Sequence, residues 1–389
     1  MDKLLVLPVL ARTIFAALSR LITNPFISGP KANTLFKDIA YAALRVNLSE
    51  ISPAQEQWTN PTTESVYLDF ARKARVEPDV TTLDSGVKVA WLGPKTAEKV
   101  VLYFHGGGYV LAASTGHVKW VAELQQDLSK GQDVAVVLLT YTLAPRAQYP
   151  TQLRQAAESL KWLIDTEQRK ASNVRSHGQR NQQAGICSDA LADLYRWRLG
   201  RRESDSRAAL TPPTPASRSC GNVAYQPVRA PRRCSADLSL GKRVWSSVLS
   251  SRPHADFLDP QVNFSPEQDS VRRNATSDMI TARAAKRWSS LFMGNSSLDN
   301  YNQPVLAEWE WFSNLDSVVK DILVWGGGGE VLIDSIQVIE RKLRKAHPRT
   351  EYVEQPHAGH EDFIIEKLLG YTAKAEGTKV VESWIAARL

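Results

Sequence analysis

A run of glycines after an apolar segment is the first feature that could carry chemistry. Val100–Phe104 is apolar and leads into His105, Gly106, Gly107 and Gly108. An acyl-transfer oxyanion needs backbone N–H donors aimed at one point, and glycines bring those amides close because they carry no Cβ. We predict an oxyanion hole formed by Gly106, Gly107 and Gly108, with His105 bracing the loop. The alternative is an ordinary glycine turn.

An acid and a histidine follow two later apolar runs. Glu330 comes after Ile322–Trp325 and four glycines, and His360 follows a short segment around Val353. A carboxylate at a strand's carboxyl end can hold an imidazole in the tautomer that a general base needs. We predict Glu330 as the acid and His360 as the base. Asp334 competes for the first role.

The histidine also has a competitor, and the nucleophile is missing. His357 lies three residues before His360, which is favoured because Gly359 frees the loop just before it. The order nucleophile, acid, histidine is that of an α/β-hydrolase, whose serine sits on a G-x-S-x-G turn. No such turn stands between the glycine loop and the acid. The nearest approximation, Gly185–Asp189, follows a polar stretch and ends in a residue too large for the turn.

The segment 174–261 differs from the rest of the chain in composition. The chain carries 48 Lys and Arg against 41 Asp and Glu, a net charge of +7. The segment holds 14 of the basic and 7 of the acidic residues, so the remainder is neutral with 34 of each. The positive charge therefore does not argue for a nucleic-acid partner. All three cysteines lie in the segment, and they do not predict a disulfide framework.

A translated intron and a shifted reading frame explain this segment. The codons of Tyr195–Leu210, read one nucleotide later, can spell TGGDSAGGNLTLALL, which contains the nucleophile turn G-D-S-A-G. The serine codon would then straddle Leu199 and Gly200. We interpret residues 174–261 as non-native or disordered sequence, retained from the gene. The alternative is a divergent surface insertion.

Splice signals are consistent with two retained introns. The first begins at Val174 with a donor-like codon pair and ends near Asp193 after 19 codons plus one nucleotide. The second begins inside Gly241 and ends at Gln261 after 20 codons plus two nucleotides. Removing both deletes 40 codons, so the original frame returns at Val262.

Strands alternate with helices in the rest of the chain, which predicts an α/β fold with a mostly parallel central sheet, helices on both faces and a helical cap. The expected strands are 87–92, 100–104, 134–140, 322–325 and 352–354, and the expected helices are 117–128, 150–165, 276–292, 334–346 and 361–369. We expect a helical N-terminal segment over 1–64 and a hydrolase domain over 65–389, interrupted by 174–261.

The N-terminal stretch Leu4–Ile22 is apolar but contains Arg12 and Arg20. These arginines lie roughly 80° apart around a helix, close enough to share one polar side. A helix on a membrane surface is one interpretation, and a cap helix over the active site is the other. A signal peptide fits less well, because no clean cleavage pattern follows. We expect an intracellular protein, cytoplasmic or associated with the endoplasmic-reticulum membrane.

Four motifs together resemble the hormone-sensitive-lipase-type branch of the α/β-hydrolases. They are His105–Gly108, Tyr141–Pro145, Gly326–Asp334 and His360–Phe363, and Val324–Asp334 resembles fungal sterol-deacetylase-like members in particular. The resemblance covers about residues 65–173 and 262–389.

This resemblance implies hydrolysis of carboxylic esters, often short acyl groups on bulky apolar alcohols or secondary metabolites, with no cofactor and no metal. By position, Gly106 and Gly107 would donate to the oxyanion, Glu330 would be the acid and His360 the base. The family serine has no counterpart in this chain, so we predict that the chain as written is inactive. A non-catalytic ligand-binding relative is the second class, and the oligomeric state is left open.

Overall fold

The computed structural model describes residues 6–175, 244–247, 269–317 and 319–389, with side chains for 6–166, 269–317 and 319–389. Residues 1–162 and 243–389 form one compact unit, and 163–242 are assigned to a second. Most of the predicted aberrant segment 174–261 therefore lies outside the described residues. Its described parts are the end of one helix at Arg175 and the strand Val244–Ser247.

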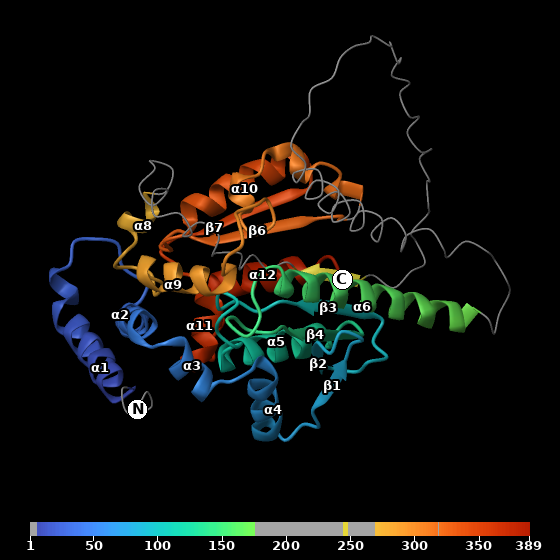
Figure 1. The fold of residues 1–389 in the computed structure, drawn as a ribbon, viewed down its shortest axis with the longest axis horizontal. Helices are drawn as coiled ribbons and strands as arrows, with labels where there is room; N and C mark the ends of the chain where they lie inside the picture. Colours follow the sequence, from blue (N-terminus) through green and yellow to red (C-terminus); the bar gives the residue numbers. More distant parts are fainter. Residues whose placement is uncertain (1–5, 176–243, 248–268, 318) are drawn as a thin grey trace, which may run out of the picture. The chain divides into compact units, whose positions relative to one another are not determined.

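Four helices precede the first strand (Figure 1). They are α1 (Val6–Thr23), α2 (Leu35–Glu50), α3 (Pro53–Thr59) and α4 (Thr63–Ala74), with a 3₁₀ turn at Asn24–Phe26. Side-chain caps fix where three of them begin: the hydroxyls of Thr34, Ser52 and Thr62 each accept a backbone N–H of the first turn. Such caps satisfy donors that the helix leaves unpaired. The predicted helical N-terminal segment is thus present in these residues.

A five-stranded sheet follows in the order β1-β2-β4-β3-β5. The strands are β1 (Asp79–Thr82), β2 (Lys88–Leu92), β3 (Lys99–Tyr103), β4 (Val134–Thr140) and β5 (Val244–Ser247). Pairing is antiparallel for β1–β2 and β2–β4, and parallel for β3–β4 and β3–β5. Strand β4 is buried from Val134 to Leu139, because a central parallel strand is covered on both faces.

Strand β5 lies inside the segment 174–261, which we interpreted as non-native or disordered. Val244–Ser247 instead pairs in parallel with β3, Val100 opposite Val244 and Tyr103 opposite Ser247. The pairing uses backbone groups, and an unpaired strand edge accepts any extended segment of suitable β propensity. The place beside β3 is therefore occupied by a strand that carries no nucleophile motif.

A second, two-stranded sheet carries the C-terminal part. Its strands β6 (Ile322–Gly327) and β7 (Thr350–Gln355) are parallel, with Ile322 opposite Thr350 and Gly327 opposite Gln355. The helices around it are α8 (Ser270–Arg273), α9 (Ala282–Met293), α10 (Ile333–Ala346), α11 (Asp362–Leu368) and α12 (Glu376–Ala386), and 3₁₀ turns occupy Pro304–Leu306, Trp309–Phe312 and Leu315–Ser317.

The predicted helices are confirmed with shifted ends. Helix α5 spans Thr115–Leu128, and α6 runs over Thr151–Arg175, beyond the expected Asp165. Helix α9 begins at Ala282 rather than Thr276, because the Thr281 hydroxyl caps it by accepting the N–H of Ala284.

One hydrophobic core joins the two sheets. Trp120 of α5 packs against Phe363 of α11, and Phe363 packs edge-on against Trp325 of β6, with ring centroids 5.2 Å apart in both pairs. The same cluster contains Val136 and Leu138 of β4. Because these rings come from distant parts of the sequence, the loops at the ends of β3, β6 and β7 are fixed relative to one another.

Candidate active site

Glu330 and His360 form a buried hydrogen-bonded pair. His360 Nδ1 lies 2.8 Å from Glu330 Oε2, and the side chains are 6% and 2% exposed. The other carboxylate oxygen, Oε1, accepts the N–H of Gly327 at 2.6 Å. The carboxylate is therefore held on both oxygens, and a proton on His360 Nδ1 directs the lone pair of the neutral ring to Nε2.

Glycines let the two loops approach closely. A Cβ on Gly327 would stand 2.4 Å from the carbonyl oxygen of Ala358, and one on Gly359 would stand 2.6 Å from the ring of Tyr41. Gly329 donates its N–H to Ala358 at 2.9 Å. No side chain fits at the first two places, so the glycine run after β6 has a structural reason: it seats the acid loop directly on the histidine loop.

The competing residues lie elsewhere. Asp334 accepts the N–H of Ser270 and pairs with Arg273 at 2.8 Å, on the helix that begins at Ile333. His357 is exposed and has a φ of 60°. Neither contacts the Glu330–His360 pair, and the roles of Glu330 as acid and His360 as base stay a prediction.

Asp278 supports both loops, and the sequence did not reveal it. Its Oδ1 accepts the backbone N–H of His360 at 3.0 Å, and its Oδ2 accepts that of Val331 at 2.8 Å. The residue is fully buried in the loop before α9. One carboxylate thus ties the residue after the acid to the histidine itself. Nothing in its local pattern distinguishes it, because its role depends on contacts 53 and 82 residues away.

These carboxylates shift the protonation of His360. Burial lowers the pKa of the imidazole, but the hydrogen bond and charge of Glu330, with the charges of Glu361 and Asp278, raise it to about 9. Burial also raises the pKa of Asp278, partly offset by His360. The carboxylates therefore favour the protonated imidazole, and the neutral ring that can accept a proton becomes more populated as the pH rises toward 9.

The glycine loop is braced as predicted. His105 is buried, its Nε2 lies 2.7 Å from Thr63 Oγ1, and its ring stacks on Tyr141 with centroids 4.2 Å apart. The Tyr141 hydroxyl donates to the carbonyl oxygens of His105 and Gly106 at 3.0 and 3.2 Å. These contacts hold the carbonyl groups and the histidine of the loop in place. Tyr141, at the start of the 141–145 turn, therefore stabilises the glycine loop.

The loop leaves its amides unused. Gly107 and Gly108 have φ angles of 100° and 63°, which favour glycine. Within the described part of the chain, the N–H groups of Gly106, Gly107 and Gly108 donate to no other group. Buried amides are normally paired, so three free donors in one loop are what an oxyanion site requires.

The glycine loop meets the histidine loop at Glu361. A Cβ on Gly106 would overlap the Glu361 carboxylate, 1.8 Å from Oε1. Glu361 has a φ of 51° and lies 3.3 Å from His117 Nε2. Because Glu361 follows His360 directly, this contact brings the glycine loop to the residue next to the Glu330–His360 pair. No local pattern points to this acidic neighbour.

A buried ionic cluster from α2 holds the start of α11. Lys37 Nζ lies 2.7 Å from Asp362 Oδ2 and 2.5 Å from Glu366 Oε1, and the Tyr41 hydroxyl donates to Asp362. Asp362 is two residues after His360. Predicted only as a helical or cap segment, the N-terminal region therefore positions the catalytic histidine candidate.

No nucleophile is seen in the described residues. Among them, no hydroxyl or thiol hydrogen-bonds His360 Nε2. The predicted serine turn and Cys187 lie outside the described residues, as does the chain directly after β5. No group of His, Cys, Asp and Glu in the described residues could hold a metal ion.

Comparison with known proteins agrees with the fold. A family model for the alpha/beta hydrolase fold matches residues 101–181, which include the glycine loop and β4. A hyperthermophilic esterase from the archaeon Pyrobaculum calidifontis superposes with a TM-score of 0.56 at 17% identity, over 92% of this chain and 97% of the other. The chain has the α/β-hydrolase fold.

Sequence relatives match shorter stretches. An ethyl acetate hydrolase of Pseudomonas putida is 35% identical over 72 residues, 18% of this chain and 21% of that protein. An esterase of Gibberella moniliformis is 37% identical over 65 residues, 17% of this chain and 19% of that protein. This chain therefore covers about a fifth of the length of each of these two curated relatives.

Proposed function

We propose that the gene encodes a serine hydrolase of carboxylic esters, and that the chain as written lacks its nucleophile. One observation carries the proposal: the buried Glu330–His360 pair adjoins, through Glu361, a glycine loop whose three N–H groups donate to no group among the described residues. Candidate acid, base and oxyanion donors then come from neighbouring loops. The fold and the esterases among the similar proteins support the same reaction class.

The reaction follows from these positions. A serine hydroxyl attacks the ester carbonyl, and His360 Nε2 takes its proton while Glu330 stabilises the imidazolium. The amides of Gly106, Gly107 and Gly108, with that of the residue after the serine, hold the oxyanion. His360 then protonates the leaving alcohol. Water hydrolyses the acyl-enzyme by the same steps, with His360 as base again. The residues need no cofactor.

The serine is proposed to come from a spliced message. The first deletion runs from Val174 through the first nucleotide of the Asp193 codon, and the second from the last two nucleotides of the Gly241 codon through Gln261. Together they remove 40 codons and join a G-D-S-A-G turn to the frame at Val262. We call the product the spliced chain. Its substrates are proposed to be short-acyl esters of bulky apolar alcohols, as in sterol-deacetylase-like enzymes. The enzyme is proposed to act inside the cell, in the cytoplasm or at the endoplasmic-reticulum membrane.

A non-catalytic hydrolase relative is the second candidate. The absence of a nucleophile in this sequence favours it. The intact acid–base pair and the unused amides favour the enzyme, since a binding protein has no need of a buried histidine held by a carboxylate.

Two measurements separate these functions. Sequencing reverse-transcribed mRNA across codons 165–270 is expected to show a product shorter by 40 codons that encodes G-D-S-A-G. The spliced chain is then expected to hydrolyse p-nitrophenyl acetate and to be blocked by a serine-directed phosphonate, whereas the chain as written is insoluble or inactive. A full-length message with no shorter form would refute the splicing proposal, and an inert, folded spliced chain would refute the enzyme.

A further inference from the structure

Helix α1 presents its apolar side to solvent. The large apolar side chains of Val6–Thr23 that are exposed are Leu7, Leu10, Ile14, Phe15, Leu18, Leu21 and Ile22. At 100° per residue they form a stripe roughly 140° wide, and Ala11 is the remaining residue near its centre. Phe15 is 72% exposed and Ile22 70%. The stripe continues past the helix at Phe26, which is 85% exposed, so the patch exceeds what isolated surface leucines explain.

The opposite side of α1 packs against α2. Arg20 is buried and makes a two-pronged pair with Asp38 of α2, Nε to Oδ2 at 2.5 Å and Nη2 to Oδ1 at 2.8 Å. Val9 is buried on the same side, and Arg12 pairs with Glu50 at 3.0 Å. Asp38 also accepts the side-chain N–H of Asn24 and the backbone N–H of Ala32. The helix therefore contacts the rest of the unit through the side that carries Arg20. Figure 1 shows α1 beside α2.

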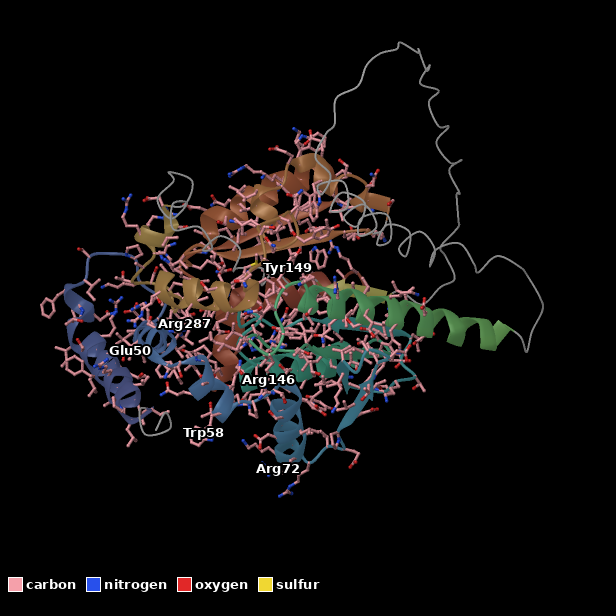
Figure 2. The ribbon with its side chains drawn as sticks, viewed as in Figure 1. Glu50, Trp58, Arg72, Arg146, Tyr149 and Arg287 are labelled. Atoms are coloured by element: carbon pink, nitrogen blue, oxygen red, sulfur yellow. The ribbon has the colours of Figure 1, made fainter. Side chains whose placement is uncertain are left out.

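Helix α2, on which α1 rests, is itself fixed to the body of the unit. Lys37 reaches Asp362 and Glu366. At the other end Arg287, labelled in Figure 2 beside Glu50, donates from α9 to the carbonyl oxygens of Ser49 at 2.9 Å and Leu48 at 2.6 Å. The orientation of the apolar stripe is thus set by the fold.

The composition of the stripe identifies its occupant. Val6–Phe26 has the length and hydropathy of a segment that can cross a membrane, yet only 11% of its apolar window is buried. The residues that dominate the binding energy of protein interfaces are enriched in Tyr, Trp and Arg, and leucine is under-represented among them. This stripe contains only aliphatic side chains and phenylalanine, which offer a partner no hydrogen-bonding group. Hydrocarbon chains require none.

We propose that α1 lies in the plane of a lipid bilayer, with its Leu7–Ile22 stripe and Phe26 among the acyl chains and its Arg20 face on the protein. A spanning α1 would have to leave α2, break the buried Arg20–Asp38 pair and carry two arginines into hydrocarbon, where charges are costly. An in-plane helix keeps both pairs and buries only the exposed side. Because Arg12 and Arg20 are already paired, binding rests on apolar contact and needs no anionic lipid.

Flotation of the full chain tests this proposal. The chain is translated in a cell-free system, cleared by ultracentrifugation and mixed with preformed phosphatidylcholine vesicles. We expect most of the cleared chain to float, with little change on adding phosphatidylserine or salt. Phe15→Glu with Ile22→Glu is expected to lower the floated fraction at least tenfold. Val76→Glu, at an apolar side chain 53% exposed after α4, is the matched control and is expected to float like the parent.

Three results would overturn the proposal. They are a parent chain that stays in the soluble fraction, a double variant that floats like the parent, or an N-terminal tag protected from added protease, which indicates a spanning helix. A lipid-free dimer that the double variant dissociates, without flotation of the parent, assigns the stripe to a second copy instead. Limited proteolysis checks that the variants fold, and Phe15→Ser alone serves if the double variant does not. Flotation does not depend on ester hydrolysis, so its outcome tests the membrane proposal separately from the proposed enzyme activity.

Discussion

Two buried histidines in this fold show how neighbours decide what a ring can do. His105 lies among neutral partners, Thr63, Tyr141 and a backbone carbonyl, and burial with the nearby His117 lowers its pKa to about 3. His360 is buried to a similar degree but faces Glu330, Glu361 and Asp278, and its pKa rises to about 9. The first ring stays neutral and braces the glycine loop. The second keeps its proton to higher pH, because three carboxylates face it.

The largest expected effect tests the choice of base. In the spliced chain, His360→Ala should lower kcat for p-nitrophenyl acetate on the order of 10⁴- to 10⁶-fold, because the serine loses its proton acceptor. His357→Ala, at the exposed neighbour, should leave kcat within about twofold, as surface substitutions usually do. Equal losses in both variants would mean that the geometry names the wrong histidine.

Asp278→Asn is expected to have the next largest effect on kcat. It separates residues that position the loops from His360, which transfers the proton. The amide keeps one oxygen for the N–H of His360 or Val331 but not both, so the two loops lose a shared tie. We expect kcat to fall roughly tenfold with little change in KM, since misplaced catalytic groups act on the chemical step. Removing the charge of Asp278 should also move the rising limb of the pH–rate profile to lower pH.

That shift in the profile separates positioning from general destabilisation. A variant that is merely less stable loses active protein at every pH without moving the limb. Asp278→Glu is the rescue control, because it restores the charge. If Asp278→Asn leaves both rate and profile unchanged, the carboxylate serves the fold alone.

Sequence predicted the site well where chemistry and local pattern coincide. The apolar runs before Gly106 and Gly326 gave strands β3 and β6, and Glu330 and His360 meet as expected. These predictions depend on an apolar strand that is followed directly by glycines or by a charged residue, which is a local pattern in the sequence. Residues whose role depends on distant partners were missed. Asp278, Glu361 and the Lys37–Asp362 pair act over separations that no pattern in one sequence reports.

The fold shows the same division. Strand β4 was predicted over its whole length because a buried parallel strand is apolar throughout. Strand β5 was not, because Val244–Ser247 is short and its pairing depends on the edge of β3 being open. The start of α9 moved by six residues, since Thr281 caps it while periodicity alone extends further back. A tertiary pairing thus places β5 and a local cap places the start of α9, and neither follows from apolar periodicity.

The smallest expected effect uses the pKa difference between the two histidines. A histidine whose folded pKa lies above its unfolded value of about 6.5 adds stability that is full below that pH. For His360 this stability is lost as pH rises from about 6.5 to 9. For His105, with a folded pKa of about 3, the sign is reversed, and stability is lost as pH falls below about 6.5. Chemical denaturation of the spliced chain and of His360→Gln should therefore give stabilities whose difference declines across pH 6.5 to 9 and stays constant between pH 5 and 6. A difference that is flat on the alkaline side would show that the carboxylates around His360 do not hold its proton, and the division between a bracing and a reacting histidine would fail at that residue.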